Sequence, residues 1–210
     1  MLTVHHLQKS QSERIVWLCE ELAIPYALKV YPRAGGMAPP EYKALHTIGR
    51  APIITDGDLS LPESGAIIEY IVGRHGGGRL GVGADAPNFA DYLFWLHFAN
   101  ASLMPSLIAD RDARAAGGED SPRKAYARER ANEAWTLIEQ RLGEAPFFAG
   151  EELTAADIMM VFNLTTMRLY VPNDLADKPN VRAYLQRIGA RPAYRRAMEK
   201  GDPGMAPNLT

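Results

Sequence analysis

Two short segments of this chain hold the residues best suited to chemistry, and the first is Ala51-Pro52. It stands directly before the apolar, strand-like run Ile53–Thr55. Proline has no N–H to give to a β-ladder, so it is expected at the entrance or edge of a strand. A cis bond after Ala51 would turn the Ala51 backbone outward, and its N–H and C=O could then pair with an extended ligand. The alternative is an ordinary turn proline, because cis X–Pro bonds are uncommon.

The second segment is Glu63-Ser64, which stands at an expected helix start. The first turn of a helix has unpaired N–H groups and the positive end of the helix dipole, so it attracts negative charge. A carboxylate beside a hydroxyl at this point is suited to holding a charged ligand. The alternative is a plain helix cap.

The single cysteine limits the chemistry further. Cys19 is alone in the chain, which excludes an intrachain disulfide, a CxxC redox pair and a cysteine-based zinc site. It lies within an apolar helical pattern, on the same face as Val16. We therefore interpret Cys19 as a small core residue and not as a nucleophile.

Length and composition indicate a soluble globular protein. The 210 residues, 47% hydrophobic and 23% charged, are enough for one large domain or two small ones. The net charge of −2, with no long run of one sign, argues against nucleic acid or an anionic membrane as partner. The N-terminus has no apolar signal core, and no apolar run approaches the ~20 residues of a membrane span. We expect a cytoplasmic location.

The first part of the chain predicts a compact α/β unit that would position both segments. Alternating and apolar runs, with Asp56-Gly57 as a hairpin signal, give the order β-α-β-α-β-β-α. The expected elements are strands at 2–7, 26–31, 53–55 and 59–61, helices at about 13–22 and 64–73, and a short helix within 37–46.

The second part predicts helices only. A glycine-rich and proline-containing stretch at 73–87 is the expected linker. Helical patterns cover 88–107 and 122–142, and others begin at Thr154, at about Asn180 and at Pro192. Thr154 and Asp157 form a capping box with aspartate in place of the usual glutamate. We expect loss of the Thr154 hydroxyl to cost about 1 kcal/mol or more.

Taken together, these motifs resemble the glutathione S-transferase family. Gly49-Arg50-Ala51-Pro52 followed by Glu63-Ser64 is similar to the glutathione-binding half, and the Thr154–Asp157 box and Lys178–Tyr184 are similar to the helical half. The resemblance covers nearly the whole chain in the right order. It implies an α/β thioredoxin-like domain at 1–75, a linker at 76–87, and an all-α helical domain at 88–210 that contributes the electrophile pocket. It also implies a homodimer.

The resemblance assigns glutathione-binding roles to five residues. Ala51 would pair its backbone with the cysteinyl part of glutathione, beside a cis Pro52. Glu63 would hold the γ-glutamyl ammonium, while Ser64 and the helix N-terminus hold its carboxylate. Arg50 is either a partner for a carboxylate of the tripeptide or a solvated loop arginine. No metal is implied.

The catalytic assignment also rests on the resemblance. Enzymes of this family hold glutathione as a thiolate, which requires a thiol pKa one to three units below about 8.5. A tyrosine, serine or cysteine after the first strand does this in the family. Here that segment has two serines and neither a tyrosine nor a cysteine. We favour Ser10, with Ser12 as the alternative; otherwise both serines cap the next helix. Arg14, one turn further on, either adds positive potential near the sulfur or pairs with Glu13, Glu21 or solvent, and we expect the second.

The implied activity is transfer of the glutathione thiolate to small hydrophobic electrophiles, a detoxification reaction. Alternatives are glutathione-dependent peroxide reduction, isomerisation, and a non-catalytic glutathione-binding or regulatory protein of the same fold. The lack of a cysteine at the site separates the chain from the beta class and disfavours thiol-disulfide chemistry. Apolar side chains are candidates for the electrophile pocket: Leu7, Tyr92, Trp95, Met104, Leu107, Met167 and Tyr170.

Overall fold

The computed structural model describes residues 1–210 and divides them into two compact units. The first unit comprises Met1–Ala84 and Arg187–Asn208, and the second comprises Asp85–Gln186 and Leu209–Thr210. The first unit thus takes in the last helix, α9 (Pro192–Gly201). The range 88–210 expected for the helical domain therefore includes a segment that packs with the sheet unit.

The first unit is built on a four-stranded sheet with the order β2-β1-β3-β4. The strands are β1 (Leu2–Leu7), β2 (Ala27–Tyr31), β3 (Ile53–Asp56) and β4 (Leu59–Pro62). β1 runs parallel to β2 and antiparallel to β3, and β3 and β4 form the hairpin expected from Asp56-Gly57. Each strand matches its sequence prediction to within one residue at either end.

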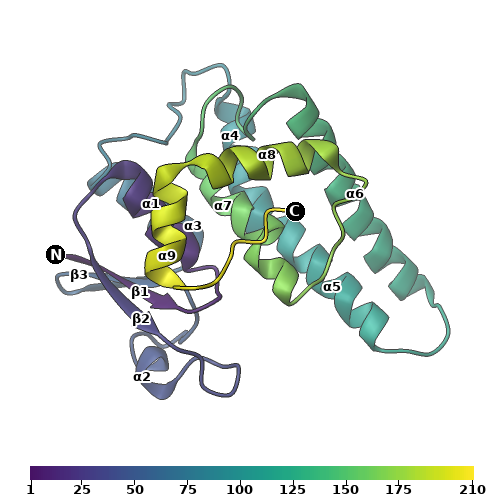
Figure 1. The fold of residues 1–210 in the computed structure, drawn as a ribbon, viewed down its shortest axis with the longest axis horizontal. Helices are drawn as coiled ribbons and strands as arrows, with labels where there is room; N and C mark the ends of the chain where they lie inside the picture. The colour runs from purple at the N-terminus through teal and green to yellow at the C-terminus, as the bar shows by residue number, and fades with distance from the viewer. The chain divides into compact units, whose positions relative to one another are not determined.

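Helices cover both faces of this sheet. α1 (Glu13–Leu22), α3 (Ser64–Arg74) and α9 lie on one side, and the short α2 (Pro40–Lys43) lies on the other (Figure 1). α9 packs against α1, where Trp17 meets Tyr194 edge to face at 5.2 Å between ring centroids. Ion pairs also join the two helices, from Glu20 to Arg196 and Lys200 and from Glu21 to Arg191. The C-terminal segment is thereby held against α1.

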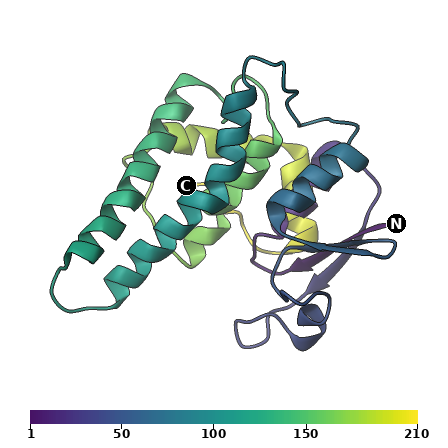
Figure 2. The same cartoon turned by 180° about the vertical axis from the view of Figure 1, so that it is seen from behind.

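The second unit consists of helices alone. They are α4 (Phe89–Phe98), η1 (Ala99–Leu103), α5 (Met104–Ala115), α6 (Pro122–Glu144), α7 (Ala155–Leu164), η2 (Thr166–Leu169) and most of α8 (Pro179–Ala190). α5 and α6 run side by side, as do α4 and α7 (Figure 2). The thioredoxin-like sheet unit and the all-helical unit confirm the predicted fold class.

The sequence pattern missed one feature of this unit. α4 and α5 are continuous through η1, a π-helical turn, and so extend well beyond the expected 88–107. Pro105 stands just after this turn and has no N–H to donate, which favours a local departure from α-helical bonding. The amide of Asn163 on α7 donates to the Ala99 carbonyl at 2.9 Å, so the irregular turn is tied to the core.

The capping box at the start of α7 is confirmed. The Thr154 backbone N–H donates to the Asp157 carboxylate at 2.9 Å, and the reciprocal bond to the Thr154 side chain is also present. Every residue of α7 is buried. The box therefore fixes the start of the central helix of the second unit.

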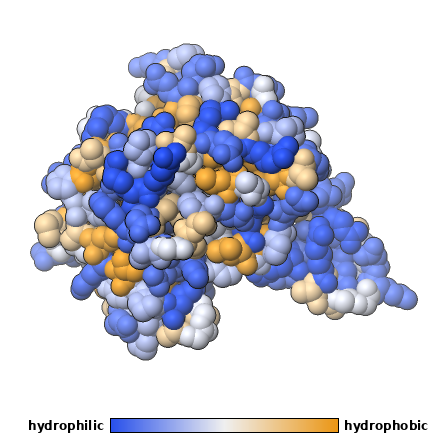
Figure 3. All heavy atoms as spheres, in the orientation of Figure 1, coloured by the Kyte–Doolittle hydropathy of each residue, from blue (hydrophilic) through white to orange (hydrophobic).

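The surface carries both signs of charge. Over the end of α5 and α6, at the right of Figure 3, hydrophilic residues dominate, and the ion pairs there include Arg114–Asp110 and Arg128–Asp120. Exposed pairs of this kind contribute about 0–1 kcal/mol each to stability. None of the helices has both the length and the apolar character that a membrane crossing requires.

Candidate functional site

Three segments of the first unit meet at one end of the sheet. β1 ends at Leu7, β3 begins at Ile53, and β4 ends at Pro62, with Ile53 paired to His5 on one side and to Pro62 on the other. Ala51 stands two residues before Ile53, and Ser64, the first residue of α3, stands two residues after Pro62. Ala51 and Leu7 share one apolar cluster. The loop after β1, the segment before β3 and the start of α3 therefore converge.

The Ala51–Pro52 peptide bond is cis, as the sequence analysis anticipated. Pro52 is buried and Ala51 is partly exposed. Ala51 stands outside the β-ladder, whose first paired residue on this strand is Ile53. Arg50 is exposed beside it. The Ala51 backbone is thus placed at the sheet end, next to the two other segments.

Glu63 has an unusual backbone for a non-glycine residue. It precedes α3 with φ 73°, it is exposed, and its side chain makes no capping hydrogen bond. A positive φ costs an L-residue of order 1 kcal/mol or more, and such residues gather at ligand-binding sites. A plain helix cap does not explain this conformation. Glu63 therefore stands at the start of α3 without acting as its side-chain cap.

Arg14 connects the start of α3 to the loop after β1. Its Nη1 donates to Gln11 Oε1 at 2.7 Å and to Ser64 Oγ at 3.2 Å. Arg14 is 1% exposed, and burial lowers its pKa to about 9, so it stays charged at neutral pH. Of the expected partners, solvent is excluded by this burial, while the Glu13 carboxylate acts on Arg14 and opposes the effect of burial on its pKa. Its contacts join segments 50 residues apart, and no local pattern signals them.

The two candidate serines have different surroundings. Ser12 is fully buried and makes no side-chain capping bond to α1. Its Oγ accepts the Leu7 N–H at 3.0 Å, lies 3.2 Å from the Leu7 carbonyl oxygen, and so faces back toward β1. Ser10 is 6% exposed, and its Oγ accepts the Ser12 N–H at 3.2 Å. Ser10 is therefore the outer of the two hydroxyls.

The loop that carries Ser10 is fixed from two sides. Arg33 donates to the carbonyl oxygens of Gln8 and Lys9 at 2.9 and 3.1 Å. The carboxylate of Asp202, just after α9, accepts the Lys9 N–H at 2.9 Å, and Lys9 itself has φ 52°. Sequence reasoning identified neither Arg33 nor Asp202, because Asp202 is 193 residues from Lys9 along the chain. A loop held in this way keeps the Ser10 hydroxyl in place.

The cysteine does not provide a reactive thiol here, and the first histidine is held by two hydrogen bonds. Burial raises the pKa of the Cys19 thiol to about 12, and Glu20 adds to the rise, so the thiol stays protonated. This confirms Cys19 as a core residue. Burial also lowers the pKa of His5, whose ring bonds Tyr31 and Thr55.

Most of the predicted electrophile-pocket residues are core residues. Tyr92, Trp95, Leu107 and Met167 are at most 6% exposed. Trp95 packs against Phe148 with 4.9 Å between ring centroids. Leu7 belongs to the apolar cluster of the sheet unit, and Tyr170 is 42% exposed. An apolar stripe at helical spacing could not separate core from pocket in the sequence.

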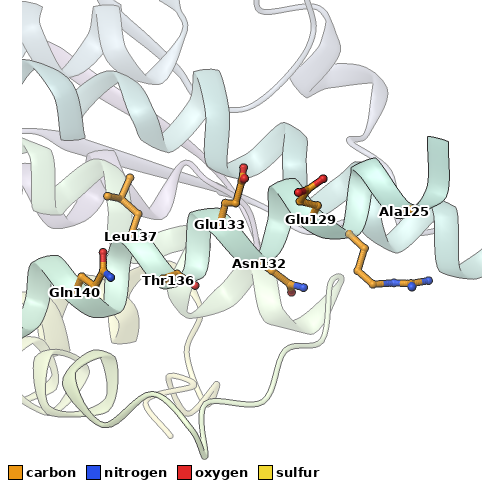
Figure 4. Close-up of a pocket in the computed structure, with 8 residues that line it drawn as sticks. Ala125, Glu129, Asn132, Glu133, Thr136, Leu137 and Gln140 are labelled. Atoms are coloured by element: carbon orange, nitrogen blue, oxygen red, sulfur yellow. The ribbon is translucent and has the colours of Figure 1, made fainter. Parts of the chain in front are cut away.

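A hollow on the second unit follows the exposed face of α6. Figure 4 shows its side chains projecting from successive turns of that one helix. They are mainly charged, amide and hydroxyl groups: Arg128, Glu129, Asn132, Glu133, Thr136 and Gln140, with Ala125 and Leu137. This lining does not suit a small apolar electrophile.

Family models match both parts of the chain. Residues 1–73 match the model of the glutathione S-transferase N-terminal domain, and residues 94–192 match that of the C-terminal domain. The chain belongs to the glutathione S-transferase family of enzymes. Glutathione S-transferase 3 of Schizosaccharomyces pombe is 34% identical over 95% of this chain and 88% of its own length.

Two further relatives support the membership. The crystal structure of a glutathione S-transferase from Actinobacillus pleuropneumoniae has a TM-score of 0.84 and 34% identity, and the match covers 100% of this chain and 99% of that one. The disulfide-bond oxidoreductase YfcG of Escherichia coli is 29% identical over 97% of both chains. Family members with different named activities are thus similar to this chain along its whole length.

Proposed function

We propose that this protein is a glutathione transferase that conjugates the glutathione thiolate to small hydrophobic electrophiles. The Ser10 hydroxyl donates a hydrogen bond to the sulfur and holds it as thiolate. A hydrogen bond to the charged form lowers a thiol pKa, and the nearby start of α1 acts in the same direction. Bringing thiolate and electrophile together then supplies the remaining acceleration through proximity.

The observation that carries the proposal is the convergence of Ser10, Ala51-Pro52 and Glu63-Ser64 at one end of the sheet. The Ala51 backbone is proposed to pair with the cysteinyl part of glutathione, which brings the sulfur toward Ser10. The difference in burial between the serines supports Ser10 over Ser12, because a bound thiol needs a hydroxyl it can reach.

The start of α3 is proposed to hold the γ-glutamyl end of glutathione. The N–H groups of α3, Ser64 and the buried Arg14 together make a positive environment for its carboxylate. The exposed Glu63 carboxylate is proposed to pair with its ammonium group, and the exposed Arg50 to meet the glycyl carboxylate. The proposed site needs no metal.

Two measurements test the proposed function together. The purified protein should be retained on immobilised glutathione and released by free glutathione, and it should conjugate glutathione to a generic aromatic halide. Retention without turnover of the halide would favour a peroxidase, an isomerase or a disulfide reductase, so a hydroperoxide and a glutathione mixed disulfide are assayed in parallel. Neither retention nor turnover would favour a non-catalytic protein of the same fold.

Replacing Glu63 with alanine is expected to weaken glutathione binding more than it lowers kcat. A charge-assisted hydrogen bond contributes about 1.5–3 kcal/mol, which corresponds to a loss of about tenfold or more in affinity. The affinity is measured by calorimetric titration. Glu63→Gln keeps the length and shape of the side chain and removes its negative charge, so it is the matched variant. An unchanged affinity in both variants would contradict the role of Glu63.

Homodimerisation and a cytoplasmic location are further parts of the proposal. The family resemblance supports the dimer, and the lone buried cysteine fits a reducing compartment. Light scattering of the purified protein should give twice the mass of one 23.1 kDa chain. The mass of one chain over the assay's concentration range would contradict the dimer.

A further inference from the structure

A buried chain of hydrogen-bonding side chains lies behind Ser10. Ser10 Oγ is 2.8 Å from Ser12 Oγ, and Ser12 Oγ is 2.9 Å from His6 Nδ1. His6 Nε2 is in turn 3.1 Å from Asp202 Oδ2. All four side chains are buried: His6 and Ser12 fully, Asp202 at 4% exposed, and Ser10, the most exposed of the four, at 6%. The four side chains form one path from the candidate site to a buried carboxylate.

The available protons determine which group donates and which accepts in each of these hydrogen bonds. A carboxylate only accepts hydrogen bonds, so when the His6 ring is neutral its proton lies on Nε2, facing Asp202, and Nδ1 is an acceptor. Ser12 has one hydroxyl proton and already accepts the Leu7 N–H. His6 Nδ1 at 2.9 Å is a closer acceptor for it than the Leu7 carbonyl at 3.2 Å. Ser12 then donates to His6, and Ser10 donates to Ser12.

In that arrangement the Ser10 proton faces away from a bound sulfur. For Ser10 to donate to a thiolate, Ser12 must donate to Ser10, and His6 must donate from Nδ1 to Ser12. His6 then has protons on both nitrogens and forms an ion pair with Asp202. Reversing these hydrogen bonds therefore adds one proton to His6, and a thiol loses one proton when it becomes a thiolate.

Resting on the glutathione transferase function proposed above, we propose that His6 keeps the proton of the glutathione thiol through a Ser10–Ser12 relay. The S–H bond breaks and its electron pair stays on sulfur, while its proton bonds to Ser10 Oγ. Ser10 gives its own hydroxyl proton to Ser12 Oγ, and Ser12 gives its own to His6 Nδ1. The products are a thiolate and an imidazolium paired with Asp202. His6, Ser12 and Asp202 are positioning residues, since Ser10 is the one member of this relay that touches the substrate.

Asp202 is the charged group in contact with His6. The other charged residues on the neighbouring elements interact with other groups. On α1, Glu20 binds Lys200, Glu21 binds Arg191, and Arg14 binds Gln11 and Ser64. On β2, Lys29 acts on His5. Two more are Glu13, buried at the start of α1, and Asp56 of β3, which binds His75. On the α9 side, Gly201 leaves room for the ring, because a Cβ there would meet His6 Nε2 at 3.0 Å.

The relay predicts an unusual proton balance. A thiol that ionises by losing its proton to solvent releases about one proton per thiolate formed. If His6 keeps the proton, the thiolate forms with little release. The thiolate is measured by its ultraviolet absorbance when glutathione is added near pH 7, and the proton by an indicator dye in weak buffer. S-methylglutathione, which has no thiol, gives the baseline for other protonation changes on binding.

Asp202→Asn is the decisive variant because it replaces the charged acceptor that faces His6 with a neutral donor of nearly the same shape. Its Oδ1 can still accept the Lys9 N–H, and its amide N–H then faces His6 Nε2. That forces the His6 proton onto Nδ1, which can no longer accept one. His6→Gln is the second variant. His75→Gln is the matched control, because it breaks another His–Asp pair of the same unit, 2.7 Å from Asp56.

The expected result is fewer than half a proton released per thiolate in the wild type and in His75→Gln, rising to about one in Asp202→Asn and in His6→Gln. A wild-type ratio near one, or an Asp202→Asn ratio equal to that of the wild type, would overturn the relay and leave the transferase function standing. Bound glutathione that forms no thiolate would instead overturn the proposed function, and the relay with it. Thermal unfolding of each variant verifies that the protein measured is folded.

Discussion

Ser10→Ala is expected to lower kcat/KM for glutathione conjugation by about 100- to 1,000-fold, the range found when a preorganised hydrogen-bond donor to a reacting anion is removed. Without the hydroxyl, the pKa of the bound thiol rises toward its ordinary value near about 8.5. At a pH below this pKa, each unit of rise lowers the fraction of thiolate about tenfold. The loss should therefore shrink as the pH is raised. Conjugation rates measured from neutral to alkaline pH give this profile.

Two variants show whether the effect belongs to the hydroxyl. Ser10→Thr keeps a donor at the same position and should retain much more activity than Ser10→Ala. Ser106→Ala removes a buried serine of the second unit, whose Oγ donates to the Ser102 carbonyl, and should leave conjugation unchanged. An unaltered rate in Ser10→Ala would move the role to Ser12 or to another group. Glutathione affinity should change little, because the α3 and Ala51 contacts remain.

The sequence predicted the elements of the fold well because their signals are local. Periodicity, the Asp56-Gly57 turn and the Thr154 box depend on residues a few positions apart, and each appears in the structure close to its expected place. The proline at a strand entrance left either a cis bond or an ordinary turn before Pro52, and the family resemblance favoured the cis bond that the structure has. The π-helical turn before Pro105 was missed because its hydrogen bonds depend on how α4 and α5 pack.

The candidate site could be predicted only in part for the same reason. Ser10, Ala51 and Glu63 lie in short motifs, so the sequence alone was enough to propose them as site residues. Asp202 and Arg14 act through contacts across 196 and 50 residues, and such contacts leave no local pattern in one sequence. His6 lies within the expected strand 2–7, and only the structure shows it between Ser12 and Asp202. Positioning residues of this kind become visible only when the chain is folded.

The stability of the second unit is expected to depend strongly on Asp157. This carboxyl is fully buried and accepts four hydrogen bonds, from the Phe148 N–H, the Thr154 N–H and hydroxyl, and the Tyr184 hydroxyl, at 2.9–3.2 Å. Burial raises its pKa to about 6 and the hydrogen bonds oppose the rise, so at neutral pH it is a carboxylate that relies on these donors. The four bonds join the start of α7 to α8 and to the segment before α7.

Asp157→Ala is therefore expected to cost about 3–5 kcal/mol, because each buried donor left without an acceptor costs about 1–3 kcal/mol and the donors can relax in part. Such a loss is a large fraction of a typical stability of about 5–15 kcal/mol. The midpoint of urea unfolding, followed by tryptophan fluorescence, measures it. Tyr184→Phe removes a single donor and should cost only about 1 kcal/mol. Equal midpoints for Asp157→Ala and Tyr184→Phe would show that the carboxylate does not anchor this unit and that the capping box contributes no more than one ordinary hydrogen bond.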